Sequence, residues 1–143
     1  MEIRHATHAD AKQISALVGE LGYTATPELI RDKLACIQES SADAVFVAVA
    51  DDRVSGCISL HALPMFHREG KLGRITSLVV ADDQQGLGMG SALLASSHVW
   101  LEDAGCVKFE VTSGDRRERA HRFYKQHGYS REGLRFARKA IKQ

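Results

Sequence analysis

The 143-residue sequence is short of several features that mark whole classes of protein. It has two prolines and three cysteines, and no apolar run approaches the ~20 residues that span a bilayer. Its first residues, MEIRHATHADAK, also lack the hydrophobic stretch of a secretory signal peptide. We therefore expect a cytoplasmic protein that has no membrane as its partner.

Net charge is also small. Lysine and arginine together number 19 and aspartate and glutamate 18, which leaves a formal net charge of +1. A balanced chain creates no overall field that would gather polyanions. We expect no nucleic-acid partner.

The three cysteines, Cys36, Cys57 and Cys106, are odd in number, far apart and set among apolar residues. This pattern suits reduced core residues better than disulfides. The paired histidine or cysteine spacing typical of a zinc site is absent, so we expect no metal.

Composition favours one domain. With 44% hydrophobic residues, the chain can enclose one sizeable core. It contains no internal repeat, low-complexity tract or linker. The sequence therefore predicts a single domain that spans residues 1–143.

Hydrophobic periodicity predicts strands alternating with helices. Strands are expected at residues 2–5, 44–50, 54–63, 75–80 and 107–111 and in a terminal region at 129–140; helices are expected at 14–21, 27–37, 89–104 and 120–127. An early hairpin and a later crossover in this order predict a mixed α/β sheet with helices on both faces.

A glycine loop, QGLGMGS at residues 85–91, lies between the strand that ends at Val80 and the helix that begins near Gly88. Main-chain amides at a helix start, together with the helix dipole, attract anions, and glycines let a phosphate approach closely. The loop therefore predicts a site for a diphosphate-bearing ligand.

Other interpretations share these glycines. A Walker A loop would end in Gly-Lys-Ser/Thr, which is absent, and a dinucleotide fold would place its glycines after the first strand. A glycine-rich strand-to-helix turn without any ligand stays open on this segment alone.

Two motifs together resemble the GNAT superfamily of N-acetyltransferases. The first is Gln85-x-x-Gly88-x-Gly90, preceded by Leu78-Val79-Val80 and followed by Ser91-Ala92-Leu93-Leu94. The second is AHRFYKQHGY at residues 120–129, which is similar to the family's A-x-x-F-Y-x-x-x-G-F/Y signature. The resemblance implies a splayed, mostly antiparallel sheet and acetyl-CoA as co-substrate.

A closer likeness concerns two shorter segments. Residues 112–117 (TSGDRR) and 133–136 (GLRF) look most like a small-molecule branch of the family that includes aminoalkylphosphonate acetyltransferases. The resemblance then implies that a small-molecule amine is the acceptor.

The resemblance also assigns roles. The family places a main-chain N–H at the position of Leu78, where it would stabilise the oxyanion, and Tyr124 would act as general acid toward the leaving thiolate. A core aromatic role for Tyr124 is the alternative. Residues implied in coenzyme binding are Leu78, Val79, Val80, Gln85, Gly86, Leu87, Gly88, Met89, Gly90 and Ser91.

The general base is missing from the strand where many family members keep a glutamate, because Arg74 and Ser77 occupy the matching positions. Water, a main-chain carbonyl or a residue of another element remain open. His61 and His67 are candidates because histidine titrates near neutral pH, although solvated loop histidines are commonplace. Arg68, Arg74 and Arg135 could recognise an acidic acceptor.

The leading hypothesis is therefore an acetyl-CoA-dependent N-acetyltransferase in which the amine of a small molecule attacks directly in a ternary complex. A protein or peptide acetyltransferase with a groove near residues 63–73, and a non-catalytic acetyl-CoA-binding regulatory module, are the alternatives. A homodimer is possible through sheet edges.

Overall fold

A five-stranded sheet organises the larger of the two units, Met1–Thr112 and Ser113–Gln143, in the computed structural model, which describes residues 1–112 and 118–141. The strands lie side by side in chain order: β1 (Glu2–His5), β2 (Asp43–Ala50), β3 (Arg53–Pro64), β4 (Lys71–Val80) and β5 (Cys106–Val111). The first four are antiparallel neighbours, and β5 runs parallel to β4. The predicted mixed, mostly antiparallel sheet is confirmed.

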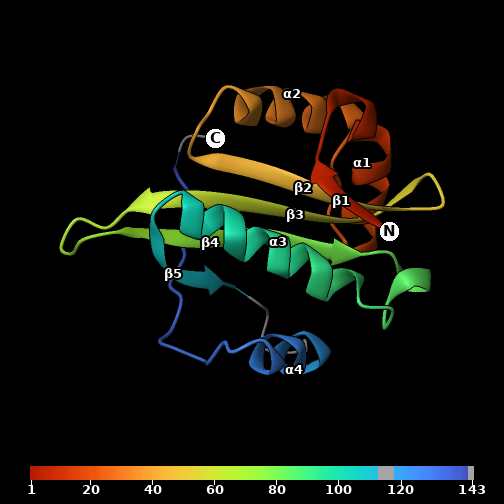
Figure 1. Cartoon of the computed structure of the whole chain (residues 1–143). Helices are drawn as coiled ribbons and strands as arrows, with labels where there is room; N and C mark the ends of the chain where they lie inside the picture. The colour runs from red at the N-terminus through yellow and green to blue at the C-terminus, as the bar shows by residue number, and fades with distance from the viewer. Residues whose placement is uncertain (113–117, 142–143) are drawn as a thin grey trace. The chain divides into compact units, whose positions relative to one another are not determined.

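Helices cover both faces of this sheet, as predicted (Figure 1). Helices α1 (Ala11–Glu20) and α2 (Pro27–Gln38) lie on one face, and α3 (Met89–Asp103) lies on the other. The start of α2 follows its sequence signal, because the Thr26 hydroxyl accepts a hydrogen bond from the Leu29 amide at 3.1 Å and Pro27 takes the first helical position.

The two faces are packed differently. On the side of α1 and α2, apolar helix residues such as Ile14 and Leu34 pack on Val45, Val47 and Cys57 of the sheet. On the side of α3, two glycines let the helix approach closely: a Cβ at Gly56 would lie 2.9 Å from Leu93 Cδ1, and one at Gly73 would lie 2.9 Å from Leu101 Cδ2. Glycine at these two places therefore sets how near α3 lies to the strands.

The second unit contains α4 (Glu118–Gln126). Its end is a left-handed cap: Gly128 adopts a φ of +88°, and the Tyr129 amide donates to the Tyr124 carbonyl at 3.0 Å. Within the described residues, no helix has both the length and the hydropathy that crossing a membrane requires.

Two expectations from the sequence are wrong. Residues 129–140 form no strand: Leu134 and Phe136 are 78% and 89% exposed, and Gly133 has a φ of +67°. A strand exists only where a neighbouring strand satisfies its main chain, which the residues of one segment cannot guarantee. Cys36 is exposed on α2, whereas Cys57 and Cys106 are buried; all three are free thiols.

Candidate functional site

Strand β4 extends beyond its neighbour β5. The pairing of these strands ends at Ile75 and Val111, while β4 continues to Val80 against β3 alone among the described residues. Residues 76–80 therefore form an open strand edge, and the sheet is split at this point.

The main chain of Leu78 faces this open edge. The Ala81 amide donates to the Ser55 carbonyl at 2.7 Å, so these two residues form a hydrogen-bonded pair. Opposed residues in an antiparallel ladder alternate between bonded and non-bonded pairs, which turns the N–H and C=O groups of Leu78 and Val80 away from β3. The Gln85 amide, 3.3 Å from the Val80 carbonyl, agrees with that orientation.

The glycine loop lies directly beyond this strand, after a short 3₁₀ turn at Asp82–Gln84. Gly86 and Gly88 adopt φ angles of +81° and +85°, and a Cβ at either position would meet no atom within 4 Å. Since α3 begins at Met89, the amides of Met89 and Gly90 have no acceptor within the helix. The open space, the positive helix end and these amides fit a diphosphate group.

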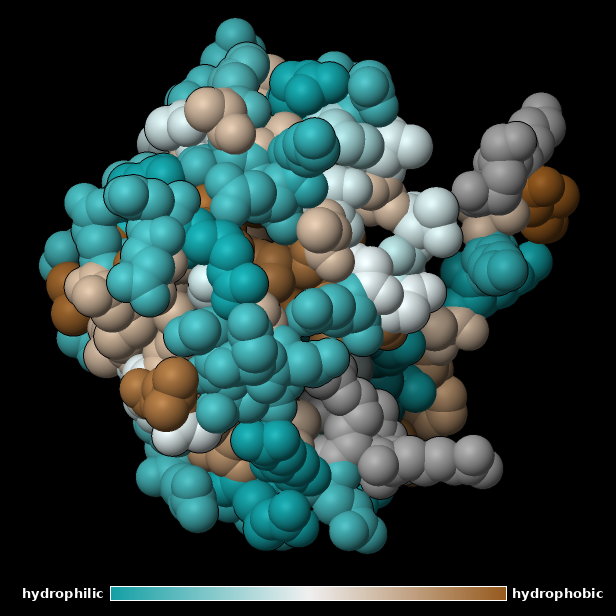
Figure 2. All heavy atoms as spheres, turned by 90° about the vertical axis from the view of Figure 1, so that its right-hand side faces the viewer, coloured by the Kyte–Doolittle hydropathy of each residue, from teal (hydrophilic) through white to brown (hydrophobic). Residues whose placement is uncertain are grey.

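The surface around the start of α3 is polar. Figure 2 looks onto the end of the sheet where α3 begins, and most of the atoms in view are hydrophilic, with hydrophobic atoms in small separate patches. Leu87, in the glycine loop, is 68% exposed, whereas Val79 of β4 is only 4% exposed and belongs to the core under α1 and α2. Val79 can therefore contribute only its main chain to a ligand.

A chain of polar side chains crosses β2, β3 and β4, on the β4 side of the split. His61 Nδ1 lies 2.6 Å from Asp43 Oδ1, and His61 Nε2 lies 2.8 Å from Thr76 Oγ1. Ser59 Oγ lies 2.7 Å from the same Thr76 oxygen, and Ser40 Oγ donates to Asp43 Oδ2 at 2.6 Å. We name these five residues the polar strip.

Strand register explains this convergence. Asp43 and His61 are direct cross-strand partners on β2 and β3. A β-bulge lies opposite Ser59, where the register passes from Ser59 and Ser77 to Leu60 and Ile75, so Thr76 is the extra residue of β4. Thr76 is also the first β4 residue beyond the pairing with β5, which places its exposed side chain where the split begins.

Charges around the strip are paired. Hydrogen bonds from Ser40 and from His61 hold the pKa of Asp43 below its usual value. Arg74, the ladder partner of His61, lies 3.3 Å from Glu110 and donates to Thr112 at 2.8 Å. The guanidinium of Arg74 is thus held toward β5.

The structure brings three of the four predicted acceptor-side residues together. His61, Arg74 and Ser77 lie on adjoining β3 and β4 positions, whereas the exposed His67 lies in the turn at the opposite end of that hairpin from residues 76–80. Sequence reasoning missed Asp43, Ser59 and Thr76. Polar residues at alternate positions of otherwise apolar strands were the available signal.

Tyr124 belongs to the second unit. Its ring makes edge contacts with Phe123 and Tyr129 at centroid distances of 5.4 and 5.7 Å. Burial, with a smaller effect from Tyr124, raises the pKa of Tyr129 to about 12. The acid role of Tyr124 stays a prediction, and residues 113–117 of the predicted TSGDRR segment lie outside the described residues.

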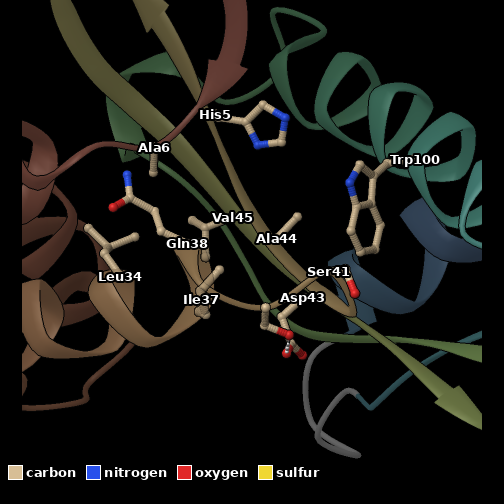
Figure 3. A pocket seen from close by; sticks show the side chains of 11 residues that line it. His5, Ala6, Leu34, Ile37, Gln38, Ser41, Asp43, Ala44, Val45 and Trp100 are labelled. Atoms are coloured by element: carbon tan, nitrogen blue, oxygen red, sulfur yellow. Dashed lines mark hydrogen bonds between the residues drawn. The ribbon is translucent and has the colours of Figure 1, made fainter.

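A cavity of about 330 Å³ lies at the edge of β2 that the short β1 leaves uncovered. Figure 3 shows His5 and Trp100 on one side, Gln38 and Ile37 of α2 on another, and the Asp43 carboxylate at the end of the strand. Asp43 therefore lies between this cavity and His61. In residues 1–112 and 118–141, no three His, Cys, Asp or Glu side chains converge as metal ligands do.

Comparison with protein families agrees with this geometry. The model of the acetyltransferase (GNAT) family matches residues 13–129. An aminoalkylphosphonate N-acetyltransferase of Salmonella typhimurium is 33% identical over 142 residues, which cover 96% of this chain and 90% of that protein.

Solved structures share the fold. A glucosamine-6-phosphate N-acetyltransferase from Arabidopsis thaliana superposes with a TM-score of 0.85 at 20% identity, covering 96% of this chain and 97% of the other. A structure of AAC(6′)-Iy with the bisubstrate analogue CoA-S-monomethyl-acetylneamine gives a TM-score of 0.85 at 16% identity, covering 98% of both chains.

Proposed function

Because the chain belongs to the acetyltransferase (GNAT) family and is an acetyl-CoA-dependent N-acetyltransferase, we propose that it acetylates the primary amine of a small molecule by direct attack in a ternary complex. The observation that carries this proposal is the open edge at residues 76–80, which leads straight into the glycine loop at the start of α3. A long, narrow substrate with a diphosphate at one end fits such an arrangement.

The main chain holds the donor substrate. Amides of the loop at residues 85–91 bind the pyrophosphate, and the β4 edge at residues 78–80 pairs with the pantetheine arm. The Leu78 N–H, which faces the open edge, stabilises the oxyanion that forms when the amine attacks, an interaction worth about 3 kcal/mol in comparable sites. Tyr124 protonates the leaving thiolate.

The acceptor is a small amine that carries an acidic group. The curated relative is named for aminoalkylphosphonates, which combine a primary amine with a phosphonate. Of Arg68 and Arg74, Arg74 lies nearer His61, on β4, where it also contacts Glu110 and Thr112, whereas Arg68 is an exposed residue of the β3–β4 turn. A guanidinium matches the oxygens of a phosphonate or carboxylate.

Release of free thiol from acetyl-CoA, followed with a panel of amines, tests the proposal. The panel contains aminoalkylphosphonates, amino acids, polyamines, aminoglycosides and lysine peptides. We expect the phosphonates to give the highest kcat/KM; preference for peptides, or coenzyme binding with no turnover by any amine, would contradict the proposal.

Initial rates with both substrates varied address the mechanism. Attack in a ternary complex gives intersecting reciprocal plots, whereas parallel lines and an acetylated protein in intact mass spectra indicate a covalent intermediate. We also propose one catalytic domain over residues 1–143, since the family match runs from residue 13 to residue 129. The homodimer, the cytoplasmic location and the lack of nucleic-acid and membrane partners stay predictions.

A further inference from the structure

The polar strip has the hydrogen-bond order of a proton relay. Its contacts run Ser59, Thr76, His61, Asp43 in space, although these residues come from three strands. Ser40 meets Asp43 from the segment after α2, so both oxygens of this carboxylate are engaged. We propose, resting on the proposed function, that His61 is the base of the reaction, that it takes the proton of the acceptor ammonium through Thr76, and that Asp43 positions it.

One assignment of hydrogens satisfies every contact in the strip. A carboxylate only accepts, so His61 Nδ1 must donate to Asp43, which leaves the lone pair of neutral His61 on Nε2. Thr76 then donates to His61 Nε2, and Ser59 donates to Thr76. The Thr76 oxygen retains one lone pair, and its side chain is exposed to accept a proton from a bound amine.

Location connects this relay with the donor substrate. Asp43, Ser59 and His61 follow by strand alternation from Val45 and Cys57, so they lie on the sheet face covered by α1 and α2. Pyrophosphate binding is assigned to the start of α3, on the opposite face. Acetyl-CoA that binds at the start of α3 and passes through the split beside residues 76–80 would place its acetyl end next to Thr76.

The proton step balances. One N–H bond of the ammonium breaks as a bond forms to Thr76 Oγ, and the former Thr76 proton moves to His61 Nε2. The nitrogen lone pair then bonds to the thioester carbon, and the C–S bond breaks. Of the two protons that the nitrogen loses in all, one resides on His61. The other replaces the proton that Tyr124 gives to the thiolate.

Neighbouring charges favour this role. Asp43 faces His61 from β2 and stabilises the imidazolium that forms, as a buried aspartate does for histidine in other proton relays. Arg74 faces it from β4, but its charge is paired with Glu110 of β5 at 3.3 Å. From the side of α2, Ser40 contacts Asp43.

The first test is the pH dependence of kcat/KM for the amine in full-length His61→Gln. The rising limb of the wild-type profile should lie at lower pH than that of the variant, and the variant should lose about 100-fold or more at pH 7. In the variant the limb should move to the pKa of the free amine. An unchanged limb would overturn the proposal.

Matched variants separate the relay from simple packing. Thr76→Val should lose almost as much kcat/KM as His61→Gln does. Thr76→Ser, which keeps the hydroxyl, should retain most of the wild-type kcat/KM. Asp43→Asn should lower kcat/KM less than His61→Gln. Coenzyme A affinity should remain within about twofold in all of them; equal activity of the Thr76→Val and Thr76→Ser variants contradicts the proton path.

Nitrogen-15 NMR of the imidazole rings tests the relay without turnover. Neutral His61 should carry its proton on Nδ1, and Asp43→Asn should change that signal. A proton on Nε2 would overturn the proposal even if acetyl transfer proceeds. If no amine of the panel is acetylated by the wild type, the proposed function is contradicted. The NMR signal of His61 is independent of turnover, so it still tests the relay.

Discussion

We assign the donor substrate to residues 78–91, the donor region, and the acceptor to the polar strip, and these two regions come from different parts of the chain. Residues 78–91 present main-chain groups. These are the N–H and C=O of Leu78, which point away from β3, the two glycines with positive φ and the amides at the start of α3. The polar strip presents only side chains, held in place by strand register. Under the proposed function, main-chain conformation binds one substrate and side-chain identity binds the other.

This contrast has a physical cause. Diphosphates need several N–H donors close together, which a helix start and glycine turns supply without any particular side chain. Moving a proton needs groups that gain and lose one, which the main chain cannot provide. In the donor region, activity should depend on substitutions that change the main-chain conformation. In the polar strip, it should depend on substitutions that change the side chain.

The largest effect in the donor region is expected for Gly88→Val. A β-branched residue at a φ of +85° is strained by about 1–3 kcal/mol, and its side chain would enter the space assigned to the diphosphate. Coenzyme A affinity, measured by isothermal titration calorimetry, should fall on the order of 100-fold. Normal affinity would mean that the loop does not hold the pyrophosphate.

Asp10 and Asp43 both have a lowered pKa, but we expect them to serve different purposes. The Asp10 carboxylate is buried, accepts two bonds from Arg4 at 2.8 and 2.9 Å, and accepts a third from the Thr7 amide at 2.7 Å. Asp10→Asn should reduce the free energy of unfolding by about 1–3 kcal/mol and leave kcat unchanged. Asp43→Asn should lower kcat more and the free energy of unfolding less, because the Asp43 side chain is 29% exposed. A large fall in kcat for the Asp10 variant would contradict this distinction.

The Asp10 effect should depend on pH. The bonds from Arg4, with the Thr7 amide, hold the pKa of Asp10 below its unfolded value of ~3.9. Its stabilisation is therefore complete above the unfolded pKa and is lost as the pH falls through the lower folded value. Urea titrations from pH 7 to pH 2 should show the gap between wild type and Asp10→Asn narrowing only in acid.

Ser59→Ala should have a smaller effect. Ser59 touches only the Thr76 oxygen in the relay, so its loss removes an orienting bond and leaves the path from Thr76 to His61 intact. We expect kcat/KM to fall by about two- to fivefold, equivalent to roughly 0.5–1 kcal/mol. A loss as large as that of Thr76→Val would place Ser59 in the proton path itself.

Leu87→Ala should have the smallest effect and serves as the control for Gly88→Val. Its side chain is 68% exposed, and the donor region acts through the main chain. Stability should stay within about 0.5 kcal/mol, and coenzyme affinity should be unchanged within error. A tenfold loss of affinity would show that the coenzyme contacts this side chain.

Much of the fold could be predicted from the sequence because its signals are local. Thr26-Pro27 starts α2, and short runs rich in apolar and β-branched residues mark five strands that all occur. Residues 129–140, predicted as a terminal strand region, form no strand, since strand pairing depends on residues elsewhere in the chain.

The candidate site divides in the same way. The glycine turn before α3, with Gly86 and Gly88, could be predicted from residue type and spacing because its signal is local. Its binding of the coenzyme stays a prediction. Asp43, His61 and Thr76 come within hydrogen-bond distance only through the register of three strands and a bulge opposite Ser59. The sequence alone thus predicts the donor region, whereas only the tertiary structure brings the side chains of the polar strip together, because a proton path depends on distances between side chains far apart in the chain.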